Sequence, residues 1–305
     1  MKLENSILKV LVYFDLFDFP LFPEEIFIYL DQPVNMADIL QILESLRSNG
    51  GVFRFKDLYS IRNDEKLSVR RIKGTQRAQL LLPFAKNISG FLFTFPFVRG
   101  IAISGSLSKN FAAEDADIDY FIITKMNRLW IARTCMHLFK KLSFLRGRQH
   151  QYCMNYYIDE KGLEIPEKNL FTAIELITLM PVLGDAVIDT FFKTNDWVNG
   201  YYPNHISKNL NHNTGMRHSR IKNLLEFLLD NRVGDWLDNY FMKLTTRRWK
   251  KKELYQKRSY KGTRMGLSTG KHFSKPNPVF FQEKILQMYT DRLNLFTSQW
   301  RMLQD

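Results

Sequence analysis

The chain has 305 residues, enough for roughly one to three domains, and 45% of them are hydrophobic, which excludes a broadly disordered protein. Its net charge of +13 favours anionic partners: nucleotides, nucleic acid or a membrane surface. Cys135 and Cys153 lack CxxC spacing, which argues against a zinc site, and no segment has the roughly 20 uninterrupted apolar residues of a membrane span. Few cysteines and no secretory leader lead us to expect a cytoplasmic protein.

The first segment, residues 1–65, has the element order of a winged-helix-like domain. Asn35 is a typical N-cap for its third helix, and a short hairpin follows around Lys56–Asp57. Such a domain binds DNA or packs against protein, and the third helix offers bases little beyond Gln41 and Arg47. The expected elements are helices at Ser6–Phe17, from Phe22 and at Met36–Ser48, and strands at Val52–Phe55 and Leu58–Ile61.

The central segment, residues 66–165, predicts an α+β module with a mixed sheet. A basic connector helix over 66–90 comes first, followed by strand, turn, strand, helix and strand. The expected strands are Val98–Ile103, Asp117–Thr124 and Tyr152–Ile158, with a helix from Leu129 to Leu142. Residues 166–305 are expected to form a helical C-terminal domain, with helices at Leu170–Leu183, Ala186–Thr194, Ser219–Leu244 and Val279–Trp300.

The stretch from Ile101 to Thr124 carries the chemistry. An apolar strand ends at Gly105-Ser106, where the missing Cβ lets a phosphate approach the backbone and the hydroxyl can donate to it. Asp117 and Asp119 open the next strand and, being two residues apart, face the same side. Two neighbouring carboxylates repel unless a cation joins them, and Mg²⁺ prefers such oxygen ligands together with substrate phosphates. The alternative is a purely structural one, in which a capped turn is followed by two solvated acids.

This pattern resembles the signature of the DNA polymerase beta-type nucleotidyltransferase superfamily, in which a Gly-Ser turn precedes an Asp-x-Asp strand. The stretch from Pro96 to Leu107 and the segment Tyr13–Pro20 also look like uncharacterised bacterial nucleotidyltransferase-domain proteins. The resemblance implies Mg²⁺ held by Asp117 and Asp119, and a nucleoside triphosphate held by Gly105 and Ser106. Active members usually carry a third carboxylate on a later strand.

The position that matches the third carboxylate is occupied by Asn155, which can orient a substrate but cannot act as a general base. Asp159 lies four residues on, on the same strand face, and is an alternative if the strand is long enough. We take Asn155 as the candidate catalytic residue beside Asp117 and Asp119. Because the third carboxylate is missing, we expect nucleotide binding more firmly than catalytic turnover.

A basic segment, residues 243–275, holds 12 Lys and Arg against one Glu, with aromatic residues between them. Such a composition binds phosphates and stacks bases, or forms a solvated basic face. Within it, Lys271 or Lys275 can reach a triphosphate from a glycine-rich loop, and Lys109 is a further candidate near the Gly-Ser turn. His137 and His150 lack partners at ligand spacing and read as packing or surface residues.

Three hypotheses follow. The first is an Mg²⁺-dependent nucleotidyltransferase that moves a nucleoside monophosphate to the hydroxyl of a small molecule, a protein or an RNA end. The second is a nucleotide-binding or regulatory protein whose catalysis is weakened by the missing third acid. The third is a winged-helix nucleic-acid binder, with nucleic acid also contacting the basic segment 243–275.

Overall fold

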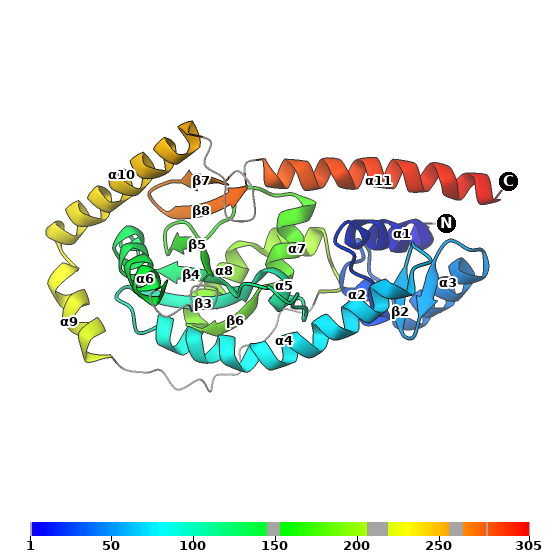
Figure 1. The fold of residues 1–305 in the computed structure, drawn as a ribbon, viewed down its shortest axis with the longest axis horizontal. Coiled ribbons are helices and arrows are strands. Elements are labelled where there is room, and N and C mark those ends of the chain that lie inside the picture. Colours follow the sequence, from blue (N-terminus) through cyan, green and yellow to red (C-terminus); the bar gives the residue numbers. More distant parts are fainter. Residues whose placement is uncertain (1, 145–152, 206–218, 256–264, 279, 305) are drawn as a thin grey trace.

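The computed structural model describes residues 2–144, 153–205, 219–255, 265–278 and 280–304. The protein is an α+β chain built around a six-stranded mixed sheet (Figure 1). The first segment folds as three helices and a hairpin, in the predicted order. Its elements are α1 (Lys2–Asp15), α2 (Pro23–Ile28), α3 (Met36–Ser48), β1 (Phe53–Phe55) and β2 (Leu58–Ser60). The Asn35 side chain caps α3 by accepting from the backbone N–H of Asp38, as predicted.

The connector is one long helix, α4 (Glu65–Leu92), which runs from the first segment along the sheet (Figure 1). The central module then follows its predicted order. It consists of β3 (Val98–Ser104), the short α5 (Gly105–Ser108), β4 (Asp119–Thr124), α6 (Leu129–Phe144) and β5 (Cys153–Asp159). Strands β3 and β4 are antiparallel, and β4 and β5 are parallel.

The region after Pro166, predicted to be almost wholly helical, instead adds three strands to the same sheet. The helix predicted for Leu170–Leu183 ends at Thr178, since Pro181 cannot continue it, and the chain pairs with β3 instead. The glycine-rich loop is a hairpin that extends the sheet beyond β5. The new strands are β6 (Met180–Leu183), β7 (Met265–Thr269) and β8 (Phe273–Pro278), giving the order β6-β3-β4-β5-β8-β7.

The remaining described helices lie around the sheet, except for α11 (Phe281–Gln304), which extends away from it toward α1. Asp230 and Asn231 interrupt the helix predicted for Ser219–Leu244, and the Asn231 side chain caps the second half. The helices are α7 (Leu170–Thr178), α8 (Asp185–Thr194), α9 (Arg220–Leu229), α10 (Arg232–Leu254) and α11 (Phe281–Gln304), with a 3-10 turn at Asp196–Gly200. Among the described residues, no helix is long and apolar enough to cross a bilayer. Residues 256–264 of the basic segment, and His150, lie outside the described part.

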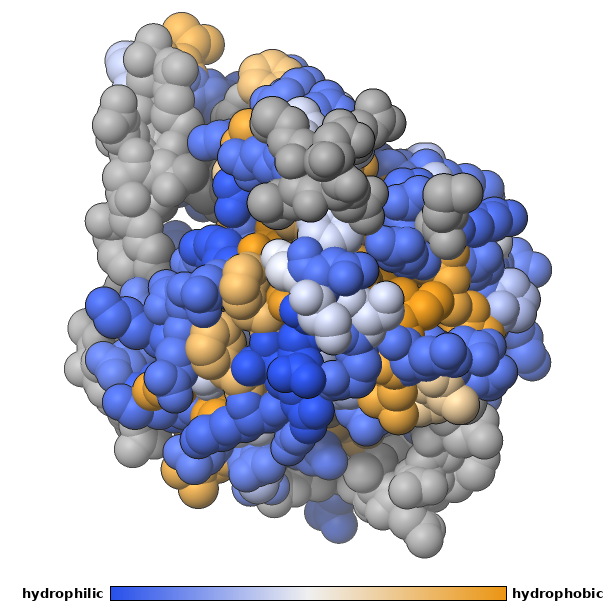
Figure 2. Space-filling model, turned by 90° about the vertical axis from the view of Figure 1, so that its right-hand side faces the viewer, coloured by the Kyte–Doolittle hydropathy of each residue, from blue (hydrophilic) through white to orange (hydrophobic). Residues whose placement is uncertain are grey.

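Alternate residues of the central strands feed two cores. Ile101, Ile103 and Ile122 join α4 and α6 on one face, whereas Ala102 and Phe121 join α1, α7 and α8 on the other. The second core continues into the first segment, and α11 returns along α1, where Arg292 contacts Asp15 at 2.8 Å. Both described ends therefore lie at one end of the molecule, whose surface is mostly hydrophilic (Figure 2).

Candidate functional site

The Gly-Ser turn and the start of the Asp-x-Asp strand lie side by side. Ser104, the last residue of β3, is the register partner of Asp119, the first residue of β4. Gly105 follows with φ +69°, and a Cβ built on it would lie 2.5 Å from Asp119 Oδ2. Both observations require glycine at this turn, because a side chain would be strained and would collide with the carboxylate.

The carboxyl group of Asp119 has a raised pKa. Burial, followed by the negative charges of Asp117 and Glu175, raises the pKa of the Asp119 carboxyl to about 7. The Cys153 side chain, hydrogen-bonded to Asp119, and the charge of Lys109 oppose this rise. Asp119 is therefore poised to take up or release a proton near neutral pH, and a bound cation would favour its ionised form.

Asp117 precedes β4 and is half-buried, as is Asp119. Between and beyond them, Ile118 and Tyr120 are buried in the core with α4 and α6. This alternation is the one that the sequence predicted, and it leaves both carboxylates away from that core.

Glu175 of α7 is a third acid near this pair, and the sequence did not single it out. The Lys109 ammonium lies 2.8 Å from Glu175 Oε1 and also donates to the Gly105 carbonyl at 3.2 Å. Lys109 thereby joins α7 to the Gly-Ser turn. The available signal was a lone charged residue in an otherwise apolar helix, Leu-Phe-Thr-Ala-Ile-Glu-Leu-Ile-Thr.

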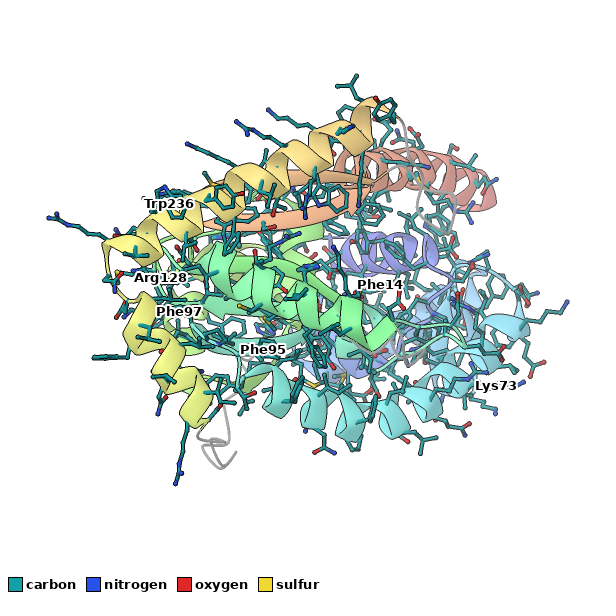
Figure 3. The ribbon with its side chains drawn as sticks, turned by 60° about the vertical axis from the view of Figure 1, so that its left-hand side comes forward. Phe14, Lys73, Phe95, Phe97, Arg128 and Trp236 are labelled. Atoms are coloured by element: carbon teal, nitrogen blue, oxygen red, sulfur yellow. The ribbon has the colours of Figure 1, made fainter. Side chains whose placement is uncertain are left out.

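A cavity of about 580 Å³ opens beside the Gly-Ser turn, and Asp117 is not among the residues that line it. Ser104, Gly105, Ser106, Lys109 and Asp119 line it, together with Glu175. The rest of the wall is largely aromatic and comes from α1, the strands and the C-terminal region. These rings belong to Tyr13, Phe14, Phe17, Phe19, Phe111, Phe121, Tyr156, Phe171 and Phe281, of which Phe14 is labelled in Figure 3.

Two further cations line the cavity. Lys275 of β8 lies with its ammonium 5.2 Å from the centre of the Tyr156 ring, and burial lowers the pKa of this ammonium. The Arg70 guanidinium of α4 lies 4.8 Å from the centre of the Phe111 ring. With Lys109, the cavity therefore combines three cationic side chains with aromatic walls, a combination that suits an anionic ligand with an aromatic group.

The structure does not bring every predicted residue to this cavity. Lys271 lies in the turn between β7 and β8 and is not among the lining residues, whereas Lys275 is. The neighbouring His272 contacts Asp159 through Nδ1 at 2.9 Å. Asp159 pairs with Thr124 at the far end of β4, five residues along the strand from Asp119, so it faces a different region.

Asp159 has a structural task at that end. Its buried carboxylate accepts hydrogen bonds from the backbone N–H groups of Asn127 and Lys161. Asn155 lies on β5 where the pairing with β4 shifts register, between the pairs that involve Met154 and Tyr156. The Asn155 side chain lies outside the described part of the structure.

No ready-made metal cage is present in the described ranges: no group of three or more His, Cys, Asp or Glu side chains has the required arrangement there. The donor set is instead two neighbouring carboxylates, with the charge of Glu175 close enough to act on Asp119. Mg²⁺ is commonly held in this way, by one or two carboxylates with the remaining positions left to substrate phosphates and water.

Comparison of the chain with protein-family models, with curated proteins and with solved structures finds no match.

Proposed function

We propose that the protein is an Mg²⁺-dependent nucleotidyltransferase that moves a nucleoside monophosphate from a nucleoside triphosphate to a hydroxyl acceptor. In this proposal residues 1–65 are a winged-helix-like domain, and the central module with its added strands is a nucleotidyltransferase domain. The observation that carries the proposal is the contact of the Gly105 turn with Asp119, inside a cavity that also holds Lys109 and Glu175.

The cavity supports the binding of a triphosphate. Gly105 lets a phosphate approach the turn, and the exposed Ser106 hydroxyl is available as a donor. Lys109, at the end of α5, and Lys275 of β8 both line the cavity and supply positive charge. The aromatic walls offer faces on which a base can stack, at roughly 1–3 kcal/mol for each stacked base.

The acidic residues fit a divalent cation. Asp117 and Asp119 are the residues that would hold Mg²⁺, which supplies charge neutralisation and polarisation at the phosphate when bound. Burial and the charges of Asp117 and Glu175 raise the pKa of the Asp119 carboxyl, and a cation beside it would offset both effects, so metal binding and ionisation of Asp119 support each other. A bound cation would thus compensate the repulsion between the neighbouring carboxylates.

The chain's own residues position the reaction. Lys109 fixes Glu175 through Oε1, so that the third carboxylate, which Asn155 does not offer, comes from α7 instead. Glu175 is then the residue proposed to accept the proton of the acceptor hydroxyl, within a site held in place by Lys109. The hydroxyl oxygen forms a bond to the α-phosphorus and pyrophosphate leaves, so that positioning and charge stabilisation provide most of the acceleration.

A nucleotide-binding protein without turnover is the second candidate. It is favoured by Asn155 at the position of the usual third acid, and by the engagement of Glu175 with Lys109. In that case a bound triphosphate would alter the conformation of the first segment. Tyr13 and Phe14 of α1, and Phe17 just after it, line the same cavity.

Labelled nucleoside triphosphates, Mg²⁺ and a cell extract separate these candidates. Transfer of label that is lost in Asp117→Ala/Asp119→Ala supports the enzyme. Saturable triphosphate binding with no transfer under any condition supports the second candidate. Equal transfer by the parent and the double variant would overturn the proposed site.

A further inference from the structure

Helix α9 turns two charged side chains, Lys222 and Glu226, toward the central module. The Lys222 ammonium donates to the carbonyls of Phe93 and Val98, each at 2.8 Å. One turn further, the Glu226 carboxylate forms a two-point ion pair with Arg99, at 2.9 and 2.7 Å. The face of α9 that contacts the central module is therefore held by charged groups.

The opposite face of α9 is largely apolar and exposed, with Arg220 and Asn223 also exposed on this helix. Ile221, Leu224, Phe227 and Leu228 are each more than half exposed, and no residue of this helix is buried. A helix of a water-soluble protein normally turns its apolar stripe inward and its charges outward. This reversed arrangement leaves contiguous apolar surface in water, which in folded proteins marks a binding face.

The same kind of surface continues on α10. Val233, Trp236 and Tyr240 are exposed at helical spacing, and the Trp236 and Tyr240 rings stack with centres 5.6 Å apart. Figure 3 shows Trp236 on the outer side of the helix. Exposed cations then continue the stripe at the same spacing. They are Lys243, Arg247 and Lys251.

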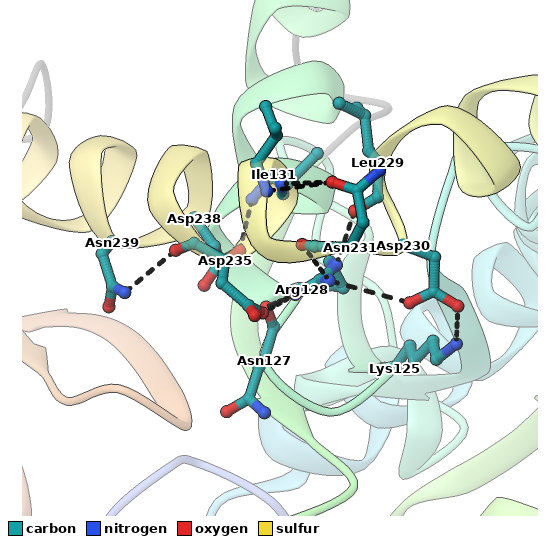
Figure 4. Close-up of polar contacts among 12 residues, drawn as sticks. Lys125, Asn127, Arg128, Ile131, Leu229, Asp230, Asn231, Asp235, Asp238 and Asn239 are labelled. Carbon is teal, nitrogen blue, oxygen red and sulfur yellow. Dashed lines mark hydrogen bonds and ion pairs between the residues drawn. The ribbon is translucent and has the colours of Figure 1, made fainter.

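The acids of this region are engaged elsewhere. Asp235 binds the buried Arg128 at 2.5 Å, and Asp238 accepts from the first backbone N–H groups of α6 (Figure 4). Asp230 pairs with Lys125, and Glu253 accepts from the backbone N–H of Leu267. The outward stripe therefore presents apolar, aromatic and cationic side chains.

Arg128 holds α9 and α10, which carry this surface, in place on the central module. Its guanidinium also donates to the carbonyls of Leu229 and Asn231, at 3.0 and 3.1 Å, across the junction of α9 and α10 (Figure 4). Because Arg128 is buried at the start of α6, it ties the junction to the central sheet.

We infer that the outward face of α9 and α10 docks the protein onto an anionic lipid bilayer. The apolar side chains of α9 enter the boundary between headgroups and acyl chains, as in interfacial amphipathic helices. Trp236 and Tyr240 lie at headgroup level, where such rings concentrate. Lys243, Arg247 and Lys251 contact anionic headgroups.

Charge and hydrophobicity together favour this occupant. Nucleic acid would use the cations but leave the exposed aliphatic groups of α9 in water. A second copy of the chain, packed through the same face, would set its cations against either the cations or the apolar side chains of the first copy. A bilayer with anionic lipid satisfies both halves of the surface.

Co-sedimentation of the full chain with vesicles tests the inference. We expect binding to vesicles of phosphatidylcholine with about 30% phosphatidylglycerol at low salt, and much weaker binding to phosphatidylcholine alone. Lys243→Glu/Arg247→Glu/Lys251→Glu should weaken binding by about 100-fold, since each cation near the surface contributes about a factor of five. The matched control is Lys66→Glu/Lys73→Glu/Lys86→Glu, which reverses three exposed charges on α4 and should change binding far less.

A second variant pair tests the apolar half. Phe227→Ser should weaken binding by about tenfold, whereas Leu80→Ser on α4 should not, although Phe227 and Leu80 are equally exposed at 81% and 79%. Circular dichroism melting checks that each variant is folded. In addition, lipids brominated near the headgroup should quench part of the tryptophan fluorescence of the parent, and Trp236→Phe should lose that part.

Several results would overturn the inference. One is no binding to anionic vesicles at low salt. Another is equal weakening by the α4 and α10 charge variants. A dimer in solution that Phe227→Ser dissociates, or RNA binding in place of vesicle binding, would identify a different occupant. Vesicle binding is measured without nucleotide, and Asp119→Asn should leave it unchanged, so its outcome is separate from that of the proposed enzyme activity.

Discussion

Gly105 and Asp119 lie so close together that a side chain at position 105 would have to displace the Asp119 carboxylate. The Cβ of any side chain at Gly105 would lie 2.5 Å from Asp119 Oδ2, and the backbone there has φ +69°. The Gly-Ser turn and the acidic strand are therefore one structural unit. A substitution in the turn should therefore alter the position of the Asp119 carboxylate.

Gly105→Ala should disable this unit. The left-handed backbone disfavours alanine by about 1 kcal/mol, and displacement of the Asp119 carboxylate adds to this, so we expect a loss of about 2 kcal/mol in the free energy of unfolding. Triphosphate affinity should fall at least tenfold. Gly90→Ala in α4 is the matched control, because a Cβ there meets nothing within 4 Å. That control should be neutral or stabilise by up to about 1 kcal/mol. Unaltered affinity in Gly105→Ala would remove the turn from the site.

The raised pKa of Asp119 predicts a pH dependence of stability. Its folded value of about 7 exceeds the ordinary value of 3.8, so the folded state binds the proton more tightly. The penalty for ionising Asp119 is absent below about pH 4, grows as the pH rises, and is complete above about pH 7. Asp119→Asn should therefore stabilise the metal-free protein most at alkaline pH.

Urea unfolding at about pH 8 and about pH 5.5 measures this effect. The stability gained by Asp119→Asn should shrink by about 2 kcal/mol between the two. Asp189→Asn, at an exposed acid of α8, sets the baseline for removing one carboxylate. Mg²⁺ should stabilise the parent at about pH 8 and leave Asp119→Asn unaffected. A gain that is the same at both pH values would show that Asp119 is not the titrating group.

The Lys109–Glu175 pair predicts a division between binding and chemistry. Glu175→Gln keeps a hydrogen-bond acceptor for Lys109 but removes the third carboxylate, so kcat should fall about 100-fold with triphosphate affinity nearly retained. Lys109→Met removes a cation from the cavity and a charge-assisted hydrogen bond, so affinity should fall about 10- to 100-fold. Lys168→Met, which breaks the exposed pair with Glu164, is the control. Full activity in Glu175→Gln would leave the third acid unassigned.

Arg128 predicts the largest loss of stability. It is buried and binds Asp235 and three backbone carbonyls. Replacing it with methionine leaves these acceptors unsatisfied, and we expect a loss of about 3 kcal/mol in the free energy of unfolding. Arg47→Met, at an exposed pair with Glu44 on α3, should cost less than about 1 kcal/mol. Chemical denaturation of both variants checks the contrast.

The sequence predicted the elements whose signals are local. Met36–Ser48 matches because one cap and one apolar stripe define it, and β4 begins where the acids meet an apolar run. Strands β7 and β8 were missed because their residues are mostly polar, and Pro276 and Pro278 favour a loop. Both prolines lie beyond Phe273 and Ser274, the β8 residues that pair with β5, so their missing N–H groups interrupt no pairing on that side.

The candidate site was predicted only in part for the same reason. Gly105, Ser106 and Asp119 are close in sequence and share the cavity, and Lys109 joins them. Glu175 and Lys275 reach it through α7 and β8, which pack there through contacts far apart along the chain. Lys271, only four residues from Lys275, lies in the β7–β8 turn instead, which periodicity alone did not reveal.

The position of the label in the product tests the central claim most directly. The protein is incubated with Mg²⁺ and a triphosphate labelled either at the α-phosphate or at the γ-phosphate, together with acceptors from a cell extract. Nucleotidyl transfer predicts that the α-label enters the acceptor and the γ-label appears in pyrophosphate, with both lost in Asp117→Ala/Asp119→Ala. Entry of the γ-label into the acceptor, or unchanged transfer by the double variant, would contradict the account.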